Sequence, residues 1–455
     1  MADTLFADHV LTPEGWARDL RVRIESDGRI GALGGPREDG DRAVGVLLPA
    51  PANLHSHAFQ RAMAGLAEAR GPGGNDSFWT WRTLMYRFLD RLTPDDVEAI
   101  AALVFMEMLE AGYASVGEFH YLHHAPGGAP YDDPAEMSAR IAAAADATGI
   151  GLTLLPVLYT YGGADKRPIG SGQVRFACDL DRFLRLHDGA GKTLKQLPAD
   201  ARIGVAPHSL RAVDQEGLHF VEHSAPDGPI HIHVAEQMRE VEEIETAFGA
   251  RPVEWLMANA AVDDRWCLIH ATHMTPSETL AVARSGAVAG LCPITESNLG
   301  DGIFDGARFV SASGAFGVGS DSNVRISLSE ELRTLEYSQR LQDRARSVLA
   351  DDGRSTGRFL FDQICRGGAK AVARDTGAIE PGRLADLVAL DAGVLDLDGL
   401  SGDAILDAFI FAGDDRWVTD VWSAGRHVVT DGRHIHRERI IATARKIFKT
   451  LRATL

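Results

Sequence analysis

Residues 47–65 read LLPAPANLHSHAFQRAMAG, apolar up to the pair His55 and His57 and more polar after it. Successive side chains of a β-strand point to opposite faces, so two histidines one residue apart point the same way. Two imidazoles on one face at the end of a strand suit a shared metal ion. Taken alone, the pair more often marks a strand that merely ends in a turn, so the remainder of the chain has to decide.

From about residue 47, short apolar runs alternate with longer helical patterns, which is typical of β/α units around a parallel sheet. One helical pattern, residues 93–113, begins with Thr93 as the cap and Pro94 at the first helical position. The eight apolar runs cover residues 46–57, 114–124, 150–160, 202–211, 229–237, 266–274, 287–297 and 316–323. They predict an α/β fold, a (β/α)8 TIM barrel over residues 47–376, with its site at the C-terminal strand ends.

The two ends of the chain have a different pattern. Residues 1–46 and 377–455 contain segments that alternate apolar and polar side chains, as antiparallel strands do. We expect them to form one small β-sandwich domain, with a C-terminal helix. Residues 67–92 begin Gly-rich and continue aromatic and basic, which suggests a lid over the barrel mouth.

Composition limits the partners. The 455 residues carry a net charge of −18 without an offsetting basic patch, which argues against nucleic acid. The N-terminus lacks a signal-peptide pattern, and no run approaches the ~20 apolar residues that span a bilayer. Four scattered cysteines without C-x-x-C spacing suggest reduced core residues. We expect a cytoplasmic homodimer with no membrane contact.

Several other strand ends carry groups that bind metals or protons. The fifth run contains His231, His233 and Glu236, the sixth contains His270 and His273, and the eighth contains Asp321. His233 lies nearer the C-terminal end than His231, so we expect His233 to bind the metal and His231 to lie lower in the barrel. Three histidines and an aspartate form a site for Zn²⁺, with Fe²⁺ and Mn²⁺ as alternatives. Alone, Asp321 would be an ordinary helix N-cap.

This combination of residues resembles the amidohydrolase superfamily, and the resemblance extends along nearly the whole chain. The motifs that carry it are H-x-H after strand one, H-x-x-E at strand five, His at strand six and Asp at strand eight. Many binuclear members carry a bridging lysine at the end of strand four, where this chain has GVAPHSLR and no lysine. The resemblance therefore implies one metal ion per subunit, held by His55, His57, His233 and Asp321.

Among members with one metal, the chain looks most like the deiminases of N-formimino-L-glutamate. The similar stretches are NLHSHAFQRAMAG, FWTWRTLMYR, GEFHYLHH, APHSLRAV, HIHVAEQ and GSDSNVRISLSEELRTLEYSQRL. The resemblance implies hydrolysis to N-formyl-L-glutamate and ammonia in histidine degradation. Residue chemistry alone leaves open whether ammonia or formamide is released.

Zinc lowers the pKa of a bound water from about 15.7 to about 7, so water is the expected nucleophile. Our hypothesis is that His270 and Asp321 position and deprotonate this water, while Glu236 exchanges a proton with the imine nitrogen. The alternatives are ordinary ones, in which Glu236 is a surface residue at the start of an acidic helix and His270 is a core histidine.

A substrate with two carboxylates needs cations and hydrogen-bond donors, for which arginine is well suited. By resemblance, Gln60, His208 and Arg211 hold one carboxylate. Arg82 and Tyr121 hold the other, although Arg82 also fits a solvated charge and Tyr121 the edge of the core.

Two other functions compete with this one. The first is an aminohydrolase of a purine or related heterocycle, whose planar ring would not require two arginines. The second is a barrel scaffold without catalysis, which the presence of all four metal ligands argues against.

Overall fold

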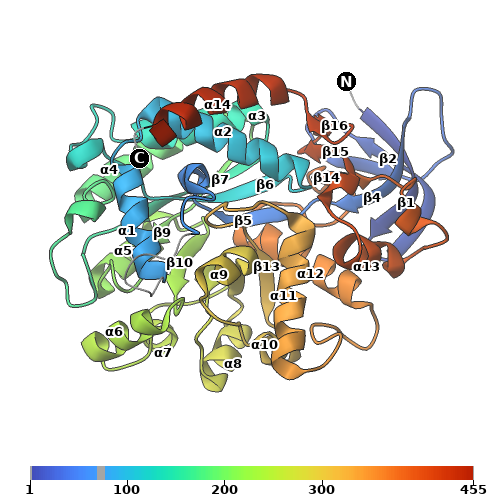
Figure 1. The fold of residues 1–455 in the computed structure, drawn as a ribbon. Coiled ribbons are helices and arrows are strands. Elements are labelled where there is room, and N and C mark those ends of the chain that lie inside the picture. The colour runs from blue at the N-terminus through green and yellow to red at the C-terminus, as the bar shows by residue number, and fades with distance from the viewer. Residues whose placement is uncertain (1–2, 69–76, 454–455) are drawn as a thin grey trace.

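The computed structural model describes residues 3–68 and 77–453, and its centre is a ring of eight parallel strands surrounded by helices (Figure 1). In chain order the ring consists of β5 (Ala52–Ser56), β6 (Ser115–His120), β7 (Gly151–Leu158), β8 (Arg202–Ile203) with β9 (Ala206–Pro207), β10 (Ile230–Val234), β11 (Trp266–His270), β12 (Val288–Leu291) and β13 (Ala315–Val318). Bridges between Ser56 and Asp321 and between Val205 and Ile230 close the ring. The predicted TIM barrel is confirmed.

The first predicted run, residues 46–57, is divided in the structure. Its first part belongs to β4 (Arg42–Pro49), which pairs with strands of another sheet, and only β5 enters the barrel. Pro49 and Pro51 flank the break, and proline supplies no N–H to continue a ladder. The other barrel strands lie within their predicted runs, except that β13 begins one residue earlier.

Helices follow the barrel strands and cover them. Helix α2 has the predicted start, because Thr93 caps it, Pro94 is its first residue and the Asp96 side chain bonds back to the backbone of Thr93. The α-helices are α1 (Phe78–Leu89), α2 (Pro94–Glu110), α3 (Glu136–Thr148), α4 (Leu180–Leu194), α5 (Gln215–Ser224), α6 (Met238–Phe248), α7 (Pro252–Asn259), α8 (Pro276–Ser285), α9 (Pro293–Leu299), α10 (Gly306–Ser311), α11 (Leu328–Asp343), α12 (Thr356–Ala371), α13 (Asp403–Phe411) and α14 (Arg437–Ala453).

The two chain ends meet in one small sheet, as predicted. Its strands are β1 (Asp3–Thr12), β2 (Gly15–Ile24), β3 (Ile30–Leu33), β4, β14 (Leu387–Leu390), β15 (Val418–Ser423), β16 (Arg426–Thr430) and β17 (Arg433–His434). They form a single hydrogen-bonded path, β17-β16-β15-β14-β4-β1-β2-β3, rather than two separate sheets. β4 joins the halves by pairing with β1 and β14.

The C-terminal helix does not pack on this sheet. Ile440 and Ala444 of α14 contact Leu103 and Met106 of α2, so α14 lies against the barrel (Figure 1). The apolar side of α14 finds its partner on a barrel helix, which overrides the expectation that it belongs to the β-domain. The division at residues 46 and 377 remains a prediction.

A buried ion network connects the sheet to the barrel. Arg374, after α12, donates to both carboxylate oxygens of Asp386 at 2.6 and 3.0 Å and pairs with Asp200 at 2.8 Å. Arg426 of β16 reaches Asp200 through two bonds of 2.8 Å. These bonds fix the small sheet to the end of the barrel away from the strand C-termini.

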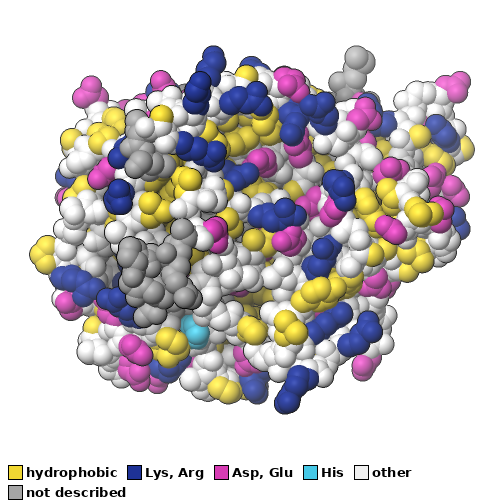
Figure 2. Space-filling view, in the orientation of Figure 1, with side chains coloured by type: hydrophobic (Ala, Val, Ile, Leu, Met, Phe, Trp, Pro, Cys, Tyr) yellow, Lys and Arg dark blue, Asp and Glu magenta, His cyan; other side chains and the backbone are white. Residues whose placement is uncertain are grey.

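The molecular surface carries both signs of charge. Figure 2 shows acidic and basic side chains mixed over one face, with basic ones along the edge where α14 lies. No helix within residues 3–68 and 77–453 is long and apolar enough to cross a membrane.

Candidate functional site

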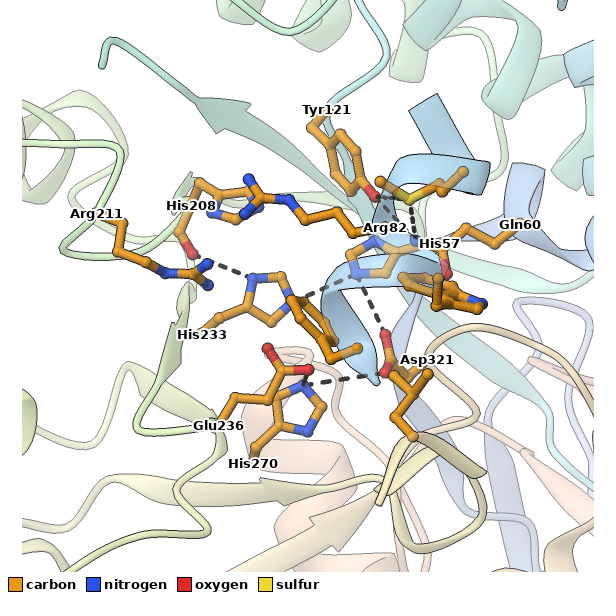
Figure 3. Close-up of a pocket in the computed structure, with 14 residues that line it drawn as sticks. His57, Gln60, Arg82, Tyr121, His208, Arg211, His233, Glu236, His270 and Asp321 are labelled. Carbon is orange, nitrogen blue, oxygen red and sulfur yellow. Dashed lines mark hydrogen bonds and ion pairs between the residues drawn. The ribbon is translucent and has the colours of Figure 1, made fainter. Parts of the chain in front are cut away.

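A pocket lies at the C-terminal ends of the barrel strands, and the predicted site residues converge on it (Figure 3). It is lined by His57, Gln60, Phe78, Trp81, Arg82, Met85, Tyr121, His208, Arg211, His233, Glu236, His270, Leu299 and Asp321. Of the eleven predicted residues only His55 is absent from the lining, because it lies completely buried below His57 and His233.

Four of these side chains offer a compact set of ligand atoms. His233 Nε2 lies 3.1 Å from His55 Nε2 and 3.3 Å from His57 Nε2. Asp321 Oδ1 lies 3.4 Å from His55 Nε2 and 3.3 Å from His57 Nε2. Ligands about 2.0–2.1 Å from a tetrahedral Zn²⁺ are roughly 3.3 Å apart, so the four atoms fit around one ion.

The second nitrogens of two histidines determine which atom faces the centre. His57 Nδ1 donates to the carbonyl of Phe119 at 2.9 Å, and His233 Nδ1 donates to the carbonyl of His208 at 3.1 Å. Both Nε2 atoms of the neutral rings then present lone pairs to each other, which is unfavourable unless a cation lies between them. The donor set therefore fits a metal ion.

The protonation states of the group agree with metal binding. Burial lowers the pKa of His55 to about 3 and also lowers the pKa values of His57 and His233. Burial opposes ionisation of Asp321, but its hydrogen bond to His55 and the charge of His57 lower the pKa of that carboxyl below its usual value. Neutral imidazoles and a carboxylate are the forms that bind metals.

A buried network that sequence reasoning missed holds strands β5 and β13 together. Asn53 donates to Ser320 Oγ at 2.7 Å, Ser320 donates to Asn323 Oδ1 at 2.6 Å, and Asn323 donates to Ser56 Oγ at 3.1 Å. Backbone bonds from His57 and Asp321 join the same strands. Asn53 precedes His55 by two residues and so shares its strand face, which was a usable signal.

The strand ends at the site have an unusual backbone. Ala235, His270 and Asp321 have φ values of 52°, 67° and 46°, a region that non-glycine residues seldom occupy. Such conformations persist only where the surrounding structure enforces them, and they cluster at functional sites. Here they turn the His270 and Asp321 side chains towards the pocket.

Glu236 and His270 face each other beside the metal ligands. His270 Nε2 lies 3.7 Å from Glu236 Oε1 and 3.9 Å from Asp321 Oδ2. Burial raises the pKa of Glu236 to about 7. Burial would lower the pKa of His270, but the Glu236, Glu296 and Asp321 carboxylates raise it well above its usual value. This pair can hold and transfer protons near neutral pH.

Two arginines reach the pocket without complete counter-charges. Arg211 is 7% exposed, its Nε has no hydrogen-bond partner, and its nearest carboxylate is Glu240 at 3.9 Å. Arg82, on α1, donates to Tyr159 Oη at 3.2 Å. Among the described residues, no carboxylate lies within ion-pair distance of Arg82. A buried cation and a partly buried one, both without a close counter-charge, favour an anionic ligand.

The other predicted contacts surround the same space. Gln60 Nε2 donates to Tyr121 Oη at 2.9 Å, and Gln60 Oε1 is buried without a partner. His208 Nδ1 lies 3.0 Å from Ser209 Oγ, and burial together with the nearby Arg211 holds the pKa of His208 well below its usual value. Amide, hydroxyl and neutral imidazole groups are thus available for hydrogen bonds to a ligand.

Two further histidines lie outside the pocket, whereas the described part of the expected lid lines it. His231 bonds to the carbonyl of Ala371 at 2.7 Å, lower in the barrel as predicted, and His273 bonds to the carbonyl of Asp301 at 2.7 Å. Residues 69–76 of the expected lid lie outside the described residues. The part that the structure describes includes α1, whose Phe78, Trp81, Arg82 and Met85 form one wall.

Comparison with known proteins accords with this geometry. Residues 46–428 match the model of the Amidohydrolase family. The chain belongs to the amidohydrolase family. Residues 2–38 of this amidohydrolase match the model described as Formimidoylglutamate deiminase HutF, N-terminal domain. Members of the family are metal dependent, in agreement with the group of three histidines and one aspartate.

Individual relatives extend along most of the amidohydrolase. A formimidoylglutamate deiminase of Pseudomonas aeruginosa is 50% identical over 439 residues, 96% of both chains. A 5-methylthioadenosine/S-adenosylhomocysteine deaminase of Natronomonas pharaonis is 28% identical over 84% of this chain and 82% of its own. The crystal structure of an amidohydrolase from Brucella melitensis has a TM-score of 0.95 at 49% identity and covers 99% of both chains.

Proposed function

We propose that this amidohydrolase hydrolyses N-formimino-L-glutamate to N-formyl-L-glutamate and ammonia, a step of histidine degradation. The observation that carries the proposal is one pocket that combines a metal-binding group with two arginines lacking complete counter-charges. The name of the Pseudomonas aeruginosa relative and the match of the N-terminal residues support the same substrate.

The reaction replaces a C=N bond with a C=O bond. Water adds to the carbon of the formimino group, and the former imine nitrogen leaves as ammonia after it has gained two protons from the water. The amide nitrogen of glutamate keeps its bond to carbon, so the product is an N-formyl amino acid. The pocket has to supply a site for water, groups that transfer protons, and residues that bind both carboxylates.

His55, His57, His233 and Asp321 are the residues that hold the metal ion, for which we propose Zn²⁺. Nitrogen and oxygen donors in this number are typical of zinc, while Fe²⁺ and Mn²⁺ remain the alternatives that metal analysis distinguishes. When bound, the ion acts as a Lewis acid and lowers the pKa of water to about 7.

The protons move through residues beside that group. His270 and Asp321, 3.9 Å apart, position the water and accept its proton. Glu236, 3.7 Å from His270, delivers a proton to the imine nitrogen. Because Glu236 is not among the four clustered ligands, it is free to exchange protons while the metal stays bound.

Different residues of the pocket bind the two carboxylates of the substrate. Gln60, His208 and Arg211 hold one carboxylate, and Arg82 with Tyr121 holds the other. The unpartnered Nε of Arg211 and the missing counter-charge of Arg82 are the physical reasons for this assignment. A purine has no carboxylate to offer to either arginine.

Product analysis tests the proposal. Zinc-loaded protein is incubated with N-formimino-L-glutamate, and ammonia, N-formylglutamate, formamide and glutamate are all quantified. We expect equal amounts of ammonia and N-formylglutamate, with little turnover of 5-methylthioadenosine in parallel. Formamide with glutamate would show that the other C–N bond breaks, and turnover of the purine alone would favour the heterocycle aminohydrolase.

The predictions of a homodimer and a cytoplasmic location stand beside this proposal. Light scattering during size-exclusion chromatography tests the homodimer, and cell fractionation tests the location.

A further inference from the structure

A buried glutamate that none of the roles above includes lies behind His270. Glu296 is on α9, directly after barrel strand β12, and is 6% exposed. Its Oε1 lies 3.2 Å from His270 Nδ1 and accepts the backbone N–H of Cys292 at 2.9 Å. A buried carboxylate that contacts the ring expected to transfer protons needs an explanation beyond packing.

We infer that Glu296 is a positioning residue for catalysis, which keeps the proton on Nδ1 of His270 and turns Nε2 towards Glu236 and the metal group. This inference rests on the proposed function, because it assigns His270 to the proton path of that reaction. It adds a residue, at the end of the seventh barrel strand, that contacts neither the metal group nor the substrate-binding side chains.

The argument begins with the hydrogen-bonding capacity of the groups. An ionised carboxylate only accepts, so the nitrogen of His270 that faces Glu296 has to carry the hydrogen. Nδ1 is then a permanent donor, whether the ring is neutral or charged. Only Nε2 can gain and lose the proton, and Nε2 is the atom that lies 3.7 Å from Glu236 and 3.9 Å from Asp321.

Without Glu296 the ring has little to orient it. The other polar partners of His270 in the described structure are both on its Nε2 side. A neutral imidazole would then be free to place its hydrogen on Nε2 or to rotate about its side-chain bonds. An orienting carboxylate behind a catalytic imidazole removes both freedoms, as it does for the histidine of the serine hydrolases.

Glu296 is itself held in place by the backbone around it. The N–H of Glu296 bonds to the carbonyl of Cys292 at 2.8 Å, and the N–H of Asp301 bonds to the carbonyl of Glu296 at 2.9 Å. The Asp301 side chain accepts from Gln237, next to Glu236, while its carbonyl accepts from His273 at 2.7 Å. The loops after strands five, six and seven are therefore joined around His270.

The experiment compares Glu296→Gln and Glu296→Ala with the wild type. Glutamine keeps an oxygen that can accept from both Cys292 and His270, whereas alanine removes the acceptor. The matched control is Glu336→Gln, because Glu336 is also buried and accepts two backbone N–H groups at 2.9 Å, but lies outside the pocket. Metal content, kcat and KM are measured for each protein, and ¹⁵N-histidine labelling reports the hydrogen-bonded Nδ1–H of His270, assigned with His270→Gln.

We expect Glu296→Ala to bind metal normally, to keep KM within about threefold, and to lose about 10- to 100-fold in kcat, the range for groups that orient a metal-site histidine. The Nδ1–H signal of His270 should disappear in this variant. Glu296→Gln should keep the signal and lose less kcat, and Glu336→Gln should match the wild type.

Unchanged kcat or an unchanged Nδ1–H signal in Glu296→Ala overturns the inference. If the alanine variant does not fold, the glutamine variant decides, because a kcat equal to that of the control also overturns it. The labelling experiment needs no substrate, so a wild type that fails to release ammonia refutes the proposed function without affecting this test.

Discussion

Replacing Arg82 by methionine tests how the pocket recognises its substrate. Methionine keeps much of the length and apolar volume of the side chain but removes the guanidinium. Arg82 donates to Tyr159 Oη at 3.2 Å and has no carboxylate partner among the described residues, so a carboxylate of the substrate is its proposed counter-charge. The change should therefore affect binding of the substrate more than the metal or the fold.

The size of the effect follows from the environment of Arg82. Removing one partner of a buried charged pair weakens the binding free energy by about 2–5 kcal/mol. Arg82 is only partly buried, which places it at the lower end, about 2–3 kcal/mol. Since 1.36 kcal/mol corresponds to a factor of ten, kcat/KM should fall by about 30- to 150-fold. Most of the loss should be in KM, because Arg82 lies on the wall of the pocket and not beside the reacting carbon.

The assay measures ammonia release from three compounds. The first is N-formimino-L-glutamate, and the other two replace either its α-carboxylate or its side-chain carboxylate by a neutral amide. In the wild type both amides should be poor substrates. The Arg82→Met variant should turn over one of the two amides as well as it turns over N-formimino-L-glutamate. That amide lacks the carboxylate that Arg82 binds, so the variant has nothing further to lose. Arg211→Met should show the same insensitivity to the other amide.

Arg87→Met is the matched control, because Arg87 is an exposed arginine on the same helix α1. Its kinetics should be those of the wild type. The reasoning would be refuted if Arg82→Met kept kcat/KM within about threefold, or if it remained equally sensitive to the loss of either carboxylate. Metal content and the thermal midpoint of the variant confirm that the site is intact.

Three further changes address the proton path, the strand-end network and the sheet contact. Glu236→Gln should bind metal normally but lose at least about a hundredfold in kcat, as measured by ammonia release, and substantial turnover would remove Glu236 from the proton path. Asn323→Ala should lower the free energy of unfolding by about 2–3 kcal/mol in a urea titration, because the buried hydroxyls of Ser320 and Ser56 lose their hydrogen bonds to Asn323; an unchanged midpoint would contradict this. Burial opposes ionisation of Asp200, but Arg426 and Arg374 lower its pKa from 3.8 to about 2. Asp200 therefore stabilises the fold above pH 3.8 and loses this contribution as the pH falls towards 2. Asp200→Asn should lower the free energy of unfolding by about 2–3 kcal/mol at pH 7 and by progressively less below pH 4. If the difference from the wild type does not change with pH, the charge of Asp200 is not the cause.

The features that the sequence predicted are those encoded by short-range periodicity. The period of two placed His55 and His57 on one face. The position of His233 nearer the C-terminal strand end separated it from His231, which bonds to the carbonyl of Ala371 instead. The rule that sites lie at the C-terminal ends of barrel strands then placed Asp321 in the same group, although locally it looks like a helix cap. Each of these inferences needed only a few residues and the fold class.

The features that the sequence did not predict depend on contacts between distant segments. Glu296 lies in the first turn of α9, where an acidic residue ordinarily interacts with the helix dipole, so local sequence suggests a routine role. Only the pairing of β12, the strand before α9, with β11 brings Glu296 to His270, 26 positions earlier. Similarly, the apolar face of α14 does not specify whether its partner is the small sheet or α2.

The arrangement also separates the chemistry of this amidohydrolase from its specificity. The residues of the metal group and His270 lie on the barrel strands or directly after them. Arg82 is on α1, a helix inserted after the first strand, and does not belong to the strand framework. Replacing Arg82 therefore changes a residue proposed to bind a carboxylate, while the buried network of Asn53, Ser320 and Asn323 between the strand ends is left as it is.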